Sequence, residues 1–205
     1  MIVSDEHRLI FIHIPKTGGS AVTHELATRG VWNYKKLTRG VRPKWQTYYH
    51  RKSGYPMHSG FQVMLEKHLD YTRFASIRSP FTWALSHFNR VRKRAGLETT
   101  REAFHEWLAM DEPTLVPNAT YRLQHRWIDA RTRLIRFETL SKDLRELMAP
   151  LEIECNLGPP IPGQESISPR APEFYSPWAI DRVAELWAED FERLGYSKEF
   201  TCWPA

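Results

Sequence analysis

The stretch IFIHIPKTGGSAVTHEL, residues 10–26, constrains the fold more than any other part of the chain. It starts inside a continuous apolar run, Leu9 to Ile14, which is the pattern of a short strand buried on both faces. A loop with two glycines and one lysine follows, and helix-forming residues then run from Ser20 to Thr28, with Gly30 as a stop signal. A buried strand, a tight loop and a helix predict the start of a βαβ unit, and therefore an α/β fold.

Two further strands are predicted, at 74–77 and at 132–138. A helical pattern follows each of them. After the first, Ser79 suits an N-cap and Pro80 suits the first helical position. After the second, a helix within 139–150 ends at its proline. This alternation of strands and helices supports the α/β prediction.

The last predicted element is an amphipathic helix that begins after Ser176, with Pro177 as its first residue. Its apolar stripe, at helical spacing, consists of Ile180, Val183, Trp187, Phe191 and Leu194. Composition predicts three other segments, namely helices within 100–110 and 118–127 and a loop over 157–172. Because no internal repeat or linker interrupts the chain, we expect one domain over residues 1–205.

Charge and cysteine content limit the functional classes only weakly. The 29 basic and 24 acidic side chains give a net charge of +5, which suits an anionic ligand but does not by itself indicate nucleic-acid binding. The two cysteines, Cys155 and Cys202, form neither a disulfide framework nor a metal-ligand pattern, and a bridge between them stays open. Neither a signal-peptide pattern nor an apolar run long enough to cross a bilayer is present in the sequence. We therefore expect a soluble, cytoplasmic protein.

The loop between the first strand and its helix suits an anion. Successive backbone N–H groups and the positive end of the helix dipole form such a site, and Gly18 and Gly19 would let the backbone curl closely around a phosphate. Lys16 adds a positive charge and Ser20 a hydroxyl, although the same pattern also fits an ordinary turn with a solvent-facing lysine. The loop is not that of a nucleotide triphosphatase, in which the lysine follows the last glycine.

The segment HIPKTGGS resembles the 5′-phosphosulfate loop of sulfotransferases that use 3′-phosphoadenosine 5′-phosphosulfate (PAPS), in the form found in the carbohydrate sulfotransferase group, sulfotransferase family 2. A second segment, ASIRSPFTWALSHF, is similar to the family's 3′-phosphate motif, an arginine at a strand end and a serine eight residues later. Here these residues are Arg78 and Ser86. The resemblance is weaker through RLIRFETLSKDL and the C-terminal helix. Three positions depart from the family pattern, and they hold Ser79, Trp83 and Phe88.

The resemblance implies a P-loop-like three-layer α/β sandwich with a central, mainly parallel sheet flanked by helices. It also implies that PAPS is the cofactor, that it is released as PAP, the desulfated product, and that no metal is required. The implied cofactor-binding residues are Pro15, Lys16, Thr17, Gly18, Gly19, Ser20, Arg78, Ser86 and, in the proline-rich loop with Ser166 and Ser168, Arg170.

Sulfuryl transfer needs charge stabilisation at the leaving oxygen and a base for the acceptor proton. We assign the first role to Lys16 and the second to His58, because carbohydrate sulfotransferases commonly carry a histidine about twenty residues before the second motif. His50 is the second choice for the base, and His13, inside the first strand, fits a core histidine with its hydrogen bonds satisfied. Glu138 fits a structural salt bridge or a residue that orients a catalytic group.

The expected function is transfer of a sulfuryl group from PAPS to a hydroxyl or amine of an acceptor, a carbohydrate or glycoconjugate. An aromatic and basic stretch offers side chains for stacking against sugars or for packing, namely Trp32, Tyr34, Trp45, Tyr48 and Tyr49. Two alternatives stay open: a catalytically inactive PAP-binding protein of the same fold, and a nucleic-acid-binding module that uses the basic stretch. The leading prediction includes no nucleic-acid partner.

Overall fold

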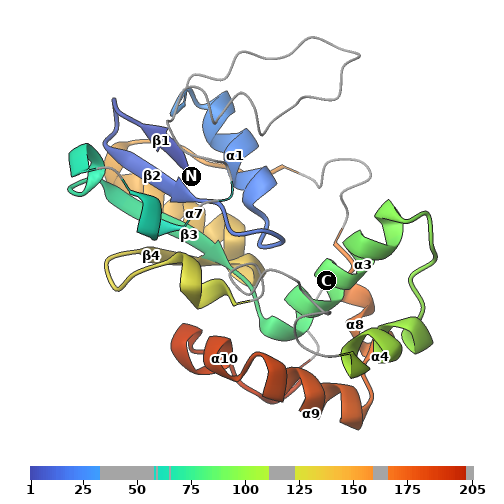
Figure 1. Ribbon diagram of the computed structural model, residues 1–205. Coiled ribbons are helices and arrows are strands. Elements are labelled where there is room, and N and C mark those ends of the chain that lie inside the picture. The colour runs from blue at the N-terminus through green and yellow to red at the C-terminus, as the bar shows by residue number, and fades with distance from the viewer. Residues whose placement is uncertain (33–57, 59, 65, 111–122, 159–165, 202–205) are drawn as a thin grey trace. The chain divides into compact units, whose positions relative to one another are not determined.

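A computed structural model of the chain describes residues 1–32, 58, 60–64, 66–110, 123–158 and 166–201 (Figure 1). The chain divides into two compact units. Unit 1 comprises Met1–Ile77 and Arg126–Pro159, and unit 2 comprises Arg78–His125 and Pro160–Ala205. The expectation of a single domain over 1–205 stays a prediction.

Within the described residues, the sheet of unit 1 has four strands in the order β1-β2-β3-β4, namely β1 (Ile2–Ser4), β2 (Leu9–Ile12), β3 (Thr72–Ile77) and β4 (Arg133–Arg136). The last three run parallel, whereas β1 pairs antiparallel with β2 (Figure 1). Phe11 lies beside Phe74 in the register of β2 and β3, and the two ring centroids are 4.9 Å apart. The three predicted strands are confirmed, and β1 was missed.

The core of unit 1 lies on one face of this sheet. Helix α1 (Gly19–Thr28) and helix α7 (Leu140–Met148) both pack apolar side chains into it. The cluster that they share with the strands includes Ile2, Leu9, Phe11, Val22, Leu26, Phe74, Ile135, Leu140, Leu144 and Met148. Ile10 and Ile12, which point to the opposite face, are also fully buried, as the continuous apolar run of β2 predicts. Short 3₁₀ helices complete the unit: η1 (Phe61–Val63), η2 (Glu66–His68), η4 (Phe137–Thr139) and η5 (Ala149–Leu151).

Unit 2 is helical and has an aromatic core. Its helices are α3 (Pro80–Arg94), α4 (Arg101–Ala109), α8 (Ala171–Phe174), α9 (Pro177–Leu186) and α10 (Ala188–Leu194), with the 3₁₀ helix η6 (Ser168–Arg170) before α8. The rings of Trp83 and Trp187 lie 6.0 Å apart, and those of Phe88 and Phe104 lie 5.3 Å apart. A further 3₁₀ helix, η3 (Gln124–Trp127), contains the boundary between the units. The α/β prediction, with a mainly parallel sheet and flanking helices, is confirmed.

A serine cap is predicted at two helix starts, and the capping hydrogen bond forms at one of them. Ser176 accepts a hydrogen bond from the Ala179 N–H at 3.2 Å, so it caps α9 as predicted. Ser79 precedes α3 and Pro80 opens it, but the Ser79 side chain makes no capping hydrogen bond. Ser79 and Pro80 therefore occupy the predicted N-cap and first helical positions, and the helix is confirmed, but Ser79 fills its position without a side-chain capping bond.

Three other boundaries differ from the sequence prediction. The C-terminal helix is divided at Trp187, whose φ and ψ of −116° and 25° interrupt the helical path before α10 begins. Within the expected helix over 118–127, residues 124–127 form a 3₁₀ turn, and 111–122 lie outside the described residues. The predicted loop over 157–172 contains η6 and the first residues of α8.

Candidate functional site

The loop between β2 and α1 has an unusual backbone. Lys16 has a φ of 71° and Gly18 has a φ of 84°, so both lie in the left-handed region. For a residue with a side chain this conformation costs about 1–2 kcal/mol, and such strain is concentrated at functional sites. Turns of this kind direct backbone N–H groups into a concave, anion-binding surface. Among the described residues, no side chain caps the N-terminus of α1, so its first N–H groups add donors to that surface.

Thr17 ties this loop to the sheet. Its hydroxyl donates to the Ile14 carbonyl oxygen at 2.9 Å and lies 2.8 Å from the hydroxyl of Ser76 on β3. Because the Thr17 hydroxyl carries one proton, Ser76 is the donor in the second bond. Both side chains are completely buried. The Thr17 side chain therefore holds the loop in place, and its predicted contact with the cofactor can come only from its backbone.

The two glycines are required by close packing as well as by backbone geometry. A Cβ atom at Gly19 would lie 2.3 Å from Cδ2 of His13, and one at Gly18 would lie 2.9 Å from the side chains of Leu140 and Phe137. The His13 ring thus lies directly against the first residue of α1. Ser20, in the first turn of that helix, is exposed, as a ligand-binding hydroxyl should be.

His58 contacts the start of the same loop. Its Nδ1 lies 3.2 Å from the carbonyl oxygen of His13, and the two rings meet edge to face with centroids 5.0 Å apart. A carbonyl oxygen only accepts, so Nδ1 carries the proton and the lone pair of a neutral His58 is on Nε2. The structure therefore brings His58 and the lysine-containing loop together in unit 1. His50 lies outside the described residues.

His13 is buried, as predicted, but it is not satisfied. Only 4% of it is exposed, and its Nδ1 has no hydrogen-bond partner in the part of the chain that the structure describes. Burial lowers its pKa well below the usual value, and the positive charge of His58 acts in the same direction. His13 is thus held neutral between Gly19 and His58.

Arg78 is the centre of a second polar site, in unit 2. Its guanidinium is buried, with Nε donating to the Thr82 hydroxyl at 3.0 Å and NH2 donating to Ser166 at 3.1 Å and to Ser168. Ser86 lies one turn after Thr82 on the same side of α3, since residues four apart share a helix face. A buried cation among hydroxyl groups, with a further serine on the same helix face, is suited to bind a phosphate.

The whole-chain comparison decides the family. The family model described as "Sulfotransferase family" matches residues 1–197. The chain belongs to the sulfotransferase family. Its group is sulfotransferase family 2, as the two motifs suggested. No curated protein and no solved structure matches the chain.

Arg170 of this sulfotransferase lies in a pocket next to the Arg78 site. The pocket has a volume of about 450 Å³ and is lined by Asn89, Lys93, Leu97, Glu98, Thr99, Ser166, Ile167 and Arg170. Ser166 lines this pocket, and its hydroxyl also accepts a hydrogen bond from Arg78. The Arg170 side chain is 57% exposed and its guanidinium pairs with Glu173 at 2.8 Å, so it reaches a ligand only if that ion pair opens or is shared.

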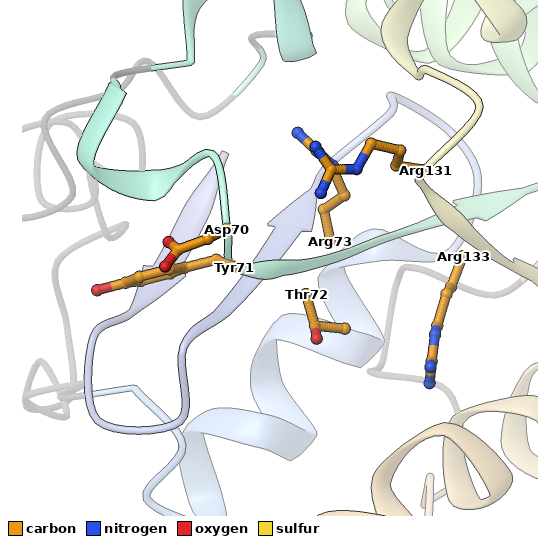
Figure 2. A pocket seen from close by; sticks show the side chains of 6 residues that line it. All are labelled: Asp70, Tyr71, Thr72, Arg73, Arg131 and Arg133. Atoms are coloured by element: carbon orange, nitrogen blue, oxygen red, sulfur yellow. The ribbon is translucent and has the colours of Figure 1, made fainter.

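A second pocket, of about 190 Å³, is rich in arginine and lies in unit 1, away from the lysine-containing loop. It is lined by Asp70, Tyr71, Thr72, Arg73, Arg131 and Arg133 (Figure 2). Thr72 pairs with Leu9 at the start of the parallel strands, whereas the lysine-containing loop follows their other end. Figure 2 shows Arg73 and Arg131 on one side of β3 and Arg133 on the other, so the three guanidinium groups do not converge. This pocket is not part of the sulfotransferase site.

The departures of this sulfotransferase from the family motif have a structural outcome. Trp83 is completely buried and its ring stacks on His87, with centroids 5.1 Å apart. Phe88 is buried in the same aromatic core. These two positions therefore pack unit 2 and bring no charge or hydroxyl to the Arg78 site. Glu138 lies in η4, directly after β4.

Of the aromatic stretch predicted for acceptor binding, Trp32 lies within the described residues. It is buried in the core of unit 1, and its Nε1 donates to the Thr23 carbonyl oxygen at 3.1 Å. Trp32 is therefore a packing residue. Tyr34, Trp45, Tyr48 and Tyr49 lie outside the described residues, as does Cys202, while Cys155 is buried.

Neither a metal-binding group of side chains nor a membrane-spanning helix occurs among the described residues. No group of three or more histidine, cysteine, aspartate or glutamate side chains is arranged there to hold a metal ion. Similarly, none of the described helices has the length and apolar character of a membrane span.

Proposed function

We propose that this sulfotransferase moves a sulfuryl group from PAPS to a hydroxyl group of a carbohydrate or glycoconjugate. The observation that carries the proposal is the strained loop 13–18, in which Lys16 and Gly18 are left-handed at the uncapped N-terminus of α1. The strain is explained if the N–H groups of this loop bind an anion, because binding then depends on the strained backbone. The donor set fits the cofactor: N–H groups, a lysine and a serine in unit 1, and a buried arginine among hydroxyl groups in unit 2.

Each candidate residue then has a defined role. The loop N–H groups and Ser20 bind the 5′-phosphate, and Lys16 stabilises the negative charge that develops on the leaving oxygen. Arg78 and Ser86 bind the 3′-phosphate, and Arg170 adds a charge at the rim of the adjoining pocket. When bound, PAPS supplies the sulfuryl group and leaves as PAP.

His58 is the base in this proposal. Its Nδ1–H donates to the His13 carbonyl oxygen, which directs the ring, and Nε2 is the atom that takes the proton of the acceptor hydroxyl. The neighbouring His13 is held neutral, so it adds no positive charge that would lower the basicity of His58. An imidazole held in this way can take a proton from the acceptor hydroxyl.

Binding and transfer need separate tests. PAP should raise the melting temperature, with or without EDTA, by an amount that grows with its concentration and corresponds to about 2.7 kcal/mol at one hundred times the dissociation constant. Transfer of ³⁵S from labelled PAPS to a panel of sugars and glycolipids should then identify the acceptor. The absence of a shift at millimolar PAP would reject the cofactor assignment, and binding without transfer to any acceptor would indicate an inactive PAP-binding protein.

A further inference from the structure

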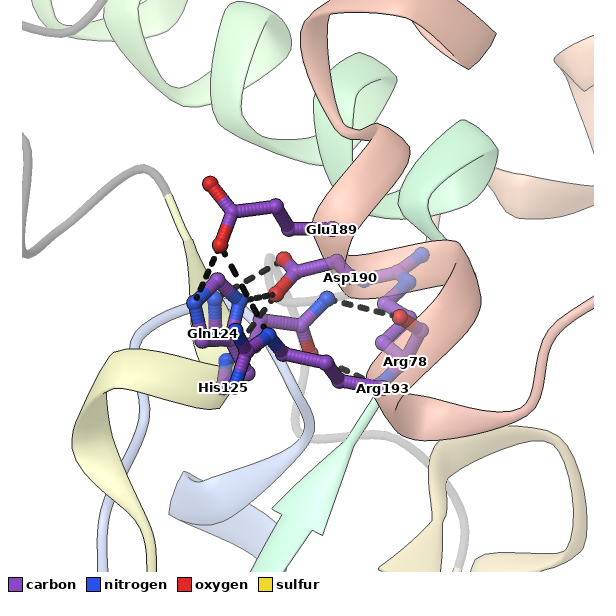
Figure 3. Close-up of polar contacts among 6 residues, drawn as sticks. All are labelled: Arg78, Gln124, His125, Glu189, Asp190 and Arg193. Carbon is purple, nitrogen blue, oxygen red and sulfur yellow. Dashed lines mark hydrogen bonds and ion pairs between the residues drawn. The ribbon is translucent and has the colours of Figure 1, made fainter.

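The main chain of Arg78 is held by the side chain of Gln124 (Figure 3). The Gln124 Oε1 accepts from the Arg78 N–H at 2.9 Å, and its Nε2 donates to the Arg78 carbonyl oxygen at 2.8 Å. Gln124 is completely buried and Arg78 is 3% exposed. One amide side chain thus satisfies both main-chain polar groups of the arginine.

The position of Arg78 explains why it needs this contact. It follows β3, which ends at Ile77, and precedes α3, which begins at Pro80. Its N–H and carbonyl groups therefore belong neither to the strand ladder nor to the helix, and buried backbone groups of this kind require a partner. The Gln124 amide acts as a neighbouring strand would. It fixes the backbone from which the guanidinium extends toward Thr82, Ser166 and the other hydroxyls.

Gln124 is itself anchored by a buried carboxylate. Asp190, on α10, has no exposed surface, and its oxygens accept from the N–H of Gln124 at 2.8 Å and from the N–H of His125 at 2.9 Å. The Nδ1 of His125 lies 2.8 Å from the same carboxylate, and its Nε2 lies 3.3 Å from Glu189. Three N–H donors offset the cost of burying the Asp190 charge. The start of η3 is thereby fixed to α10, all within unit 2.

We propose that Gln124 is a positioning residue for Arg78, and that Asp190 holds Gln124 in place for this task. The inference rests on the proposed function, in which Arg78 binds the 3′-phosphate of PAP. It predicts that the two hydrogen bonds from the Gln124 side chain to the Arg78 main chain, here called the clamp, support binding of that one phosphate and of no other part of the nucleotide. Loss of the clamp should therefore change the preference for ligands that carry a 3′-phosphate over ligands that lack it.

The test is Gln124→Leu, which keeps the size of the side chain and removes both hydrogen bonds. Dissociation constants for PAP and for adenosine 5′-phosphosulfate, which lacks the 3′-phosphate, are measured by calorimetry. We expect the PAP constant to rise about tenfold and that of adenosine 5′-phosphosulfate to change less than twofold, since a tenfold change corresponds to one charge-assisted contact. In an Arg78→Ala background the same substitution should leave the ratio of the two constants unchanged.

Two controls separate positioning from loss of structure. Leu108→Ala removes a buried side chain elsewhere in unit 2 and lowers stability, but should leave the ratio as in the wild type. Gln124→Glu keeps the acceptor and turns a carboxylate toward the Arg78 carbonyl. Protonation restores a donor there, so the ratio of the two dissociation constants in this variant should approach the wild-type ratio as the pH falls from 8 to 5.5. Variant and wild type are compared at the same pH throughout.

The outcomes separate a failure of the proposed function from a failure of the positioning role of Gln124. If Arg78→Ala weakens both ligands equally, Arg78 is not the 3′-phosphate ligand and the proposed function is wrong at that residue. If Arg78→Ala is selective but Gln124→Leu weakens both ligands equally, or neither, the positioning role of Gln124 is overturned. A ratio that still changes with Gln124→Leu in the Arg78→Ala background would also overturn it.

Discussion

Replacing Thr17 with valine removes the hydroxyl that ties the loop 13–18 to β3 and leaves the shape of the side chain almost unchanged. Two buried groups lose their partners: the Ser76 hydroxyl, which donates to Thr17, and the Ile14 carbonyl oxygen. A buried polar group without a partner costs about 1–3 kcal/mol. Because the Ser76 hydroxyl can rotate, we expect the free energy of unfolding to fall by about 2–4 kcal/mol, measured by urea denaturation.

The same substitution should weaken PAP binding. Thr17 lies between the two left-handed residues, Lys16 and Gly18, and the left-handed conformation of Lys16 costs about 1–2 kcal/mol. Without the tie the loop can relax, and binding must restore the strained form. This energy corresponds to a rise in the dissociation constant of about 5–30-fold, which calorimetry can measure.

Two further variants test the contact between the Thr17 and Ser76 hydroxyls. Thr17→Ser keeps the hydroxyl and should stay close to the wild type in both stability and affinity. Thr17→Val combined with Ser76→Ala removes both hydroxyls, so its cost should be smaller than the sum of the single costs by about 1–2 kcal/mol. Additive costs, or a Thr17→Val protein within about 0.5 kcal/mol of the wild type, would show that the two hydroxyls do not form the tie.

Other consequences follow from the same site. Gly19→Ala should destabilise the protein by about 1–3 kcal/mol, because its Cβ would lie 2.3 Å from the His13 ring; unchanged stability in urea would contradict this packing. The pKa of buried His13 is lowered, so below pH 6.5 the unfolded state binds more protons than the folded state. The free energy of unfolding should therefore decrease as the pH is lowered below 6.5, by up to about 1.4 kcal/mol per pH unit. His13→Phe should remove this dependence, and an identical slope in the variant would refute it. Lys16→Ala should lower turnover strongly at saturating PAPS, and a change in KM alone would argue against its role. His58→Ala should lower transfer by about 10²–10⁴-fold while PAP affinity stays constant; loss of PAP binding would place His58 in the cofactor pocket.

The parts of the fold that sequence pattern predicts well are those with a strong local signal. The apolar run of β2, the loop with Gly18 and Gly19, and the capped start of α9 are each contained in a few consecutive residues. β1 was missed because three residues, Ile2–Ser4, are too few to show a period, and it depends on pairing with β2. The division of the last helix at Trp187 has no glycine or proline to announce it.

The candidate site was predictable where its residues lie together in a motif. Lys16 and Ser20 follow from one short loop, and Arg78 and Ser86 from one strand end and the helix after it. The contacts that hold these residues connect distant parts of the chain. Thr17 bonds to Ser76, 59 residues away, and Gln124 bonds to Arg78, 46 residues away. A side-chain bond of this length leaves no periodic pattern in the sequence, so only the folded structure identifies it.

Asp190 is the exception, because the sequence did contain a signal for it. The apolar stripe of the last helical pattern includes Val183, Trp187 and Leu194, at spacings of four and seven residues. Asp190 lies three residues after Trp187 and four before Leu194, so it occupies a position on the same buried face. A carboxylate there costs several kcal/mol unless N–H groups compensate it. An acidic residue in an apolar stripe therefore predicts a structural anchor before its partners are known, and the N–H groups of Gln124 and His125 are those partners here.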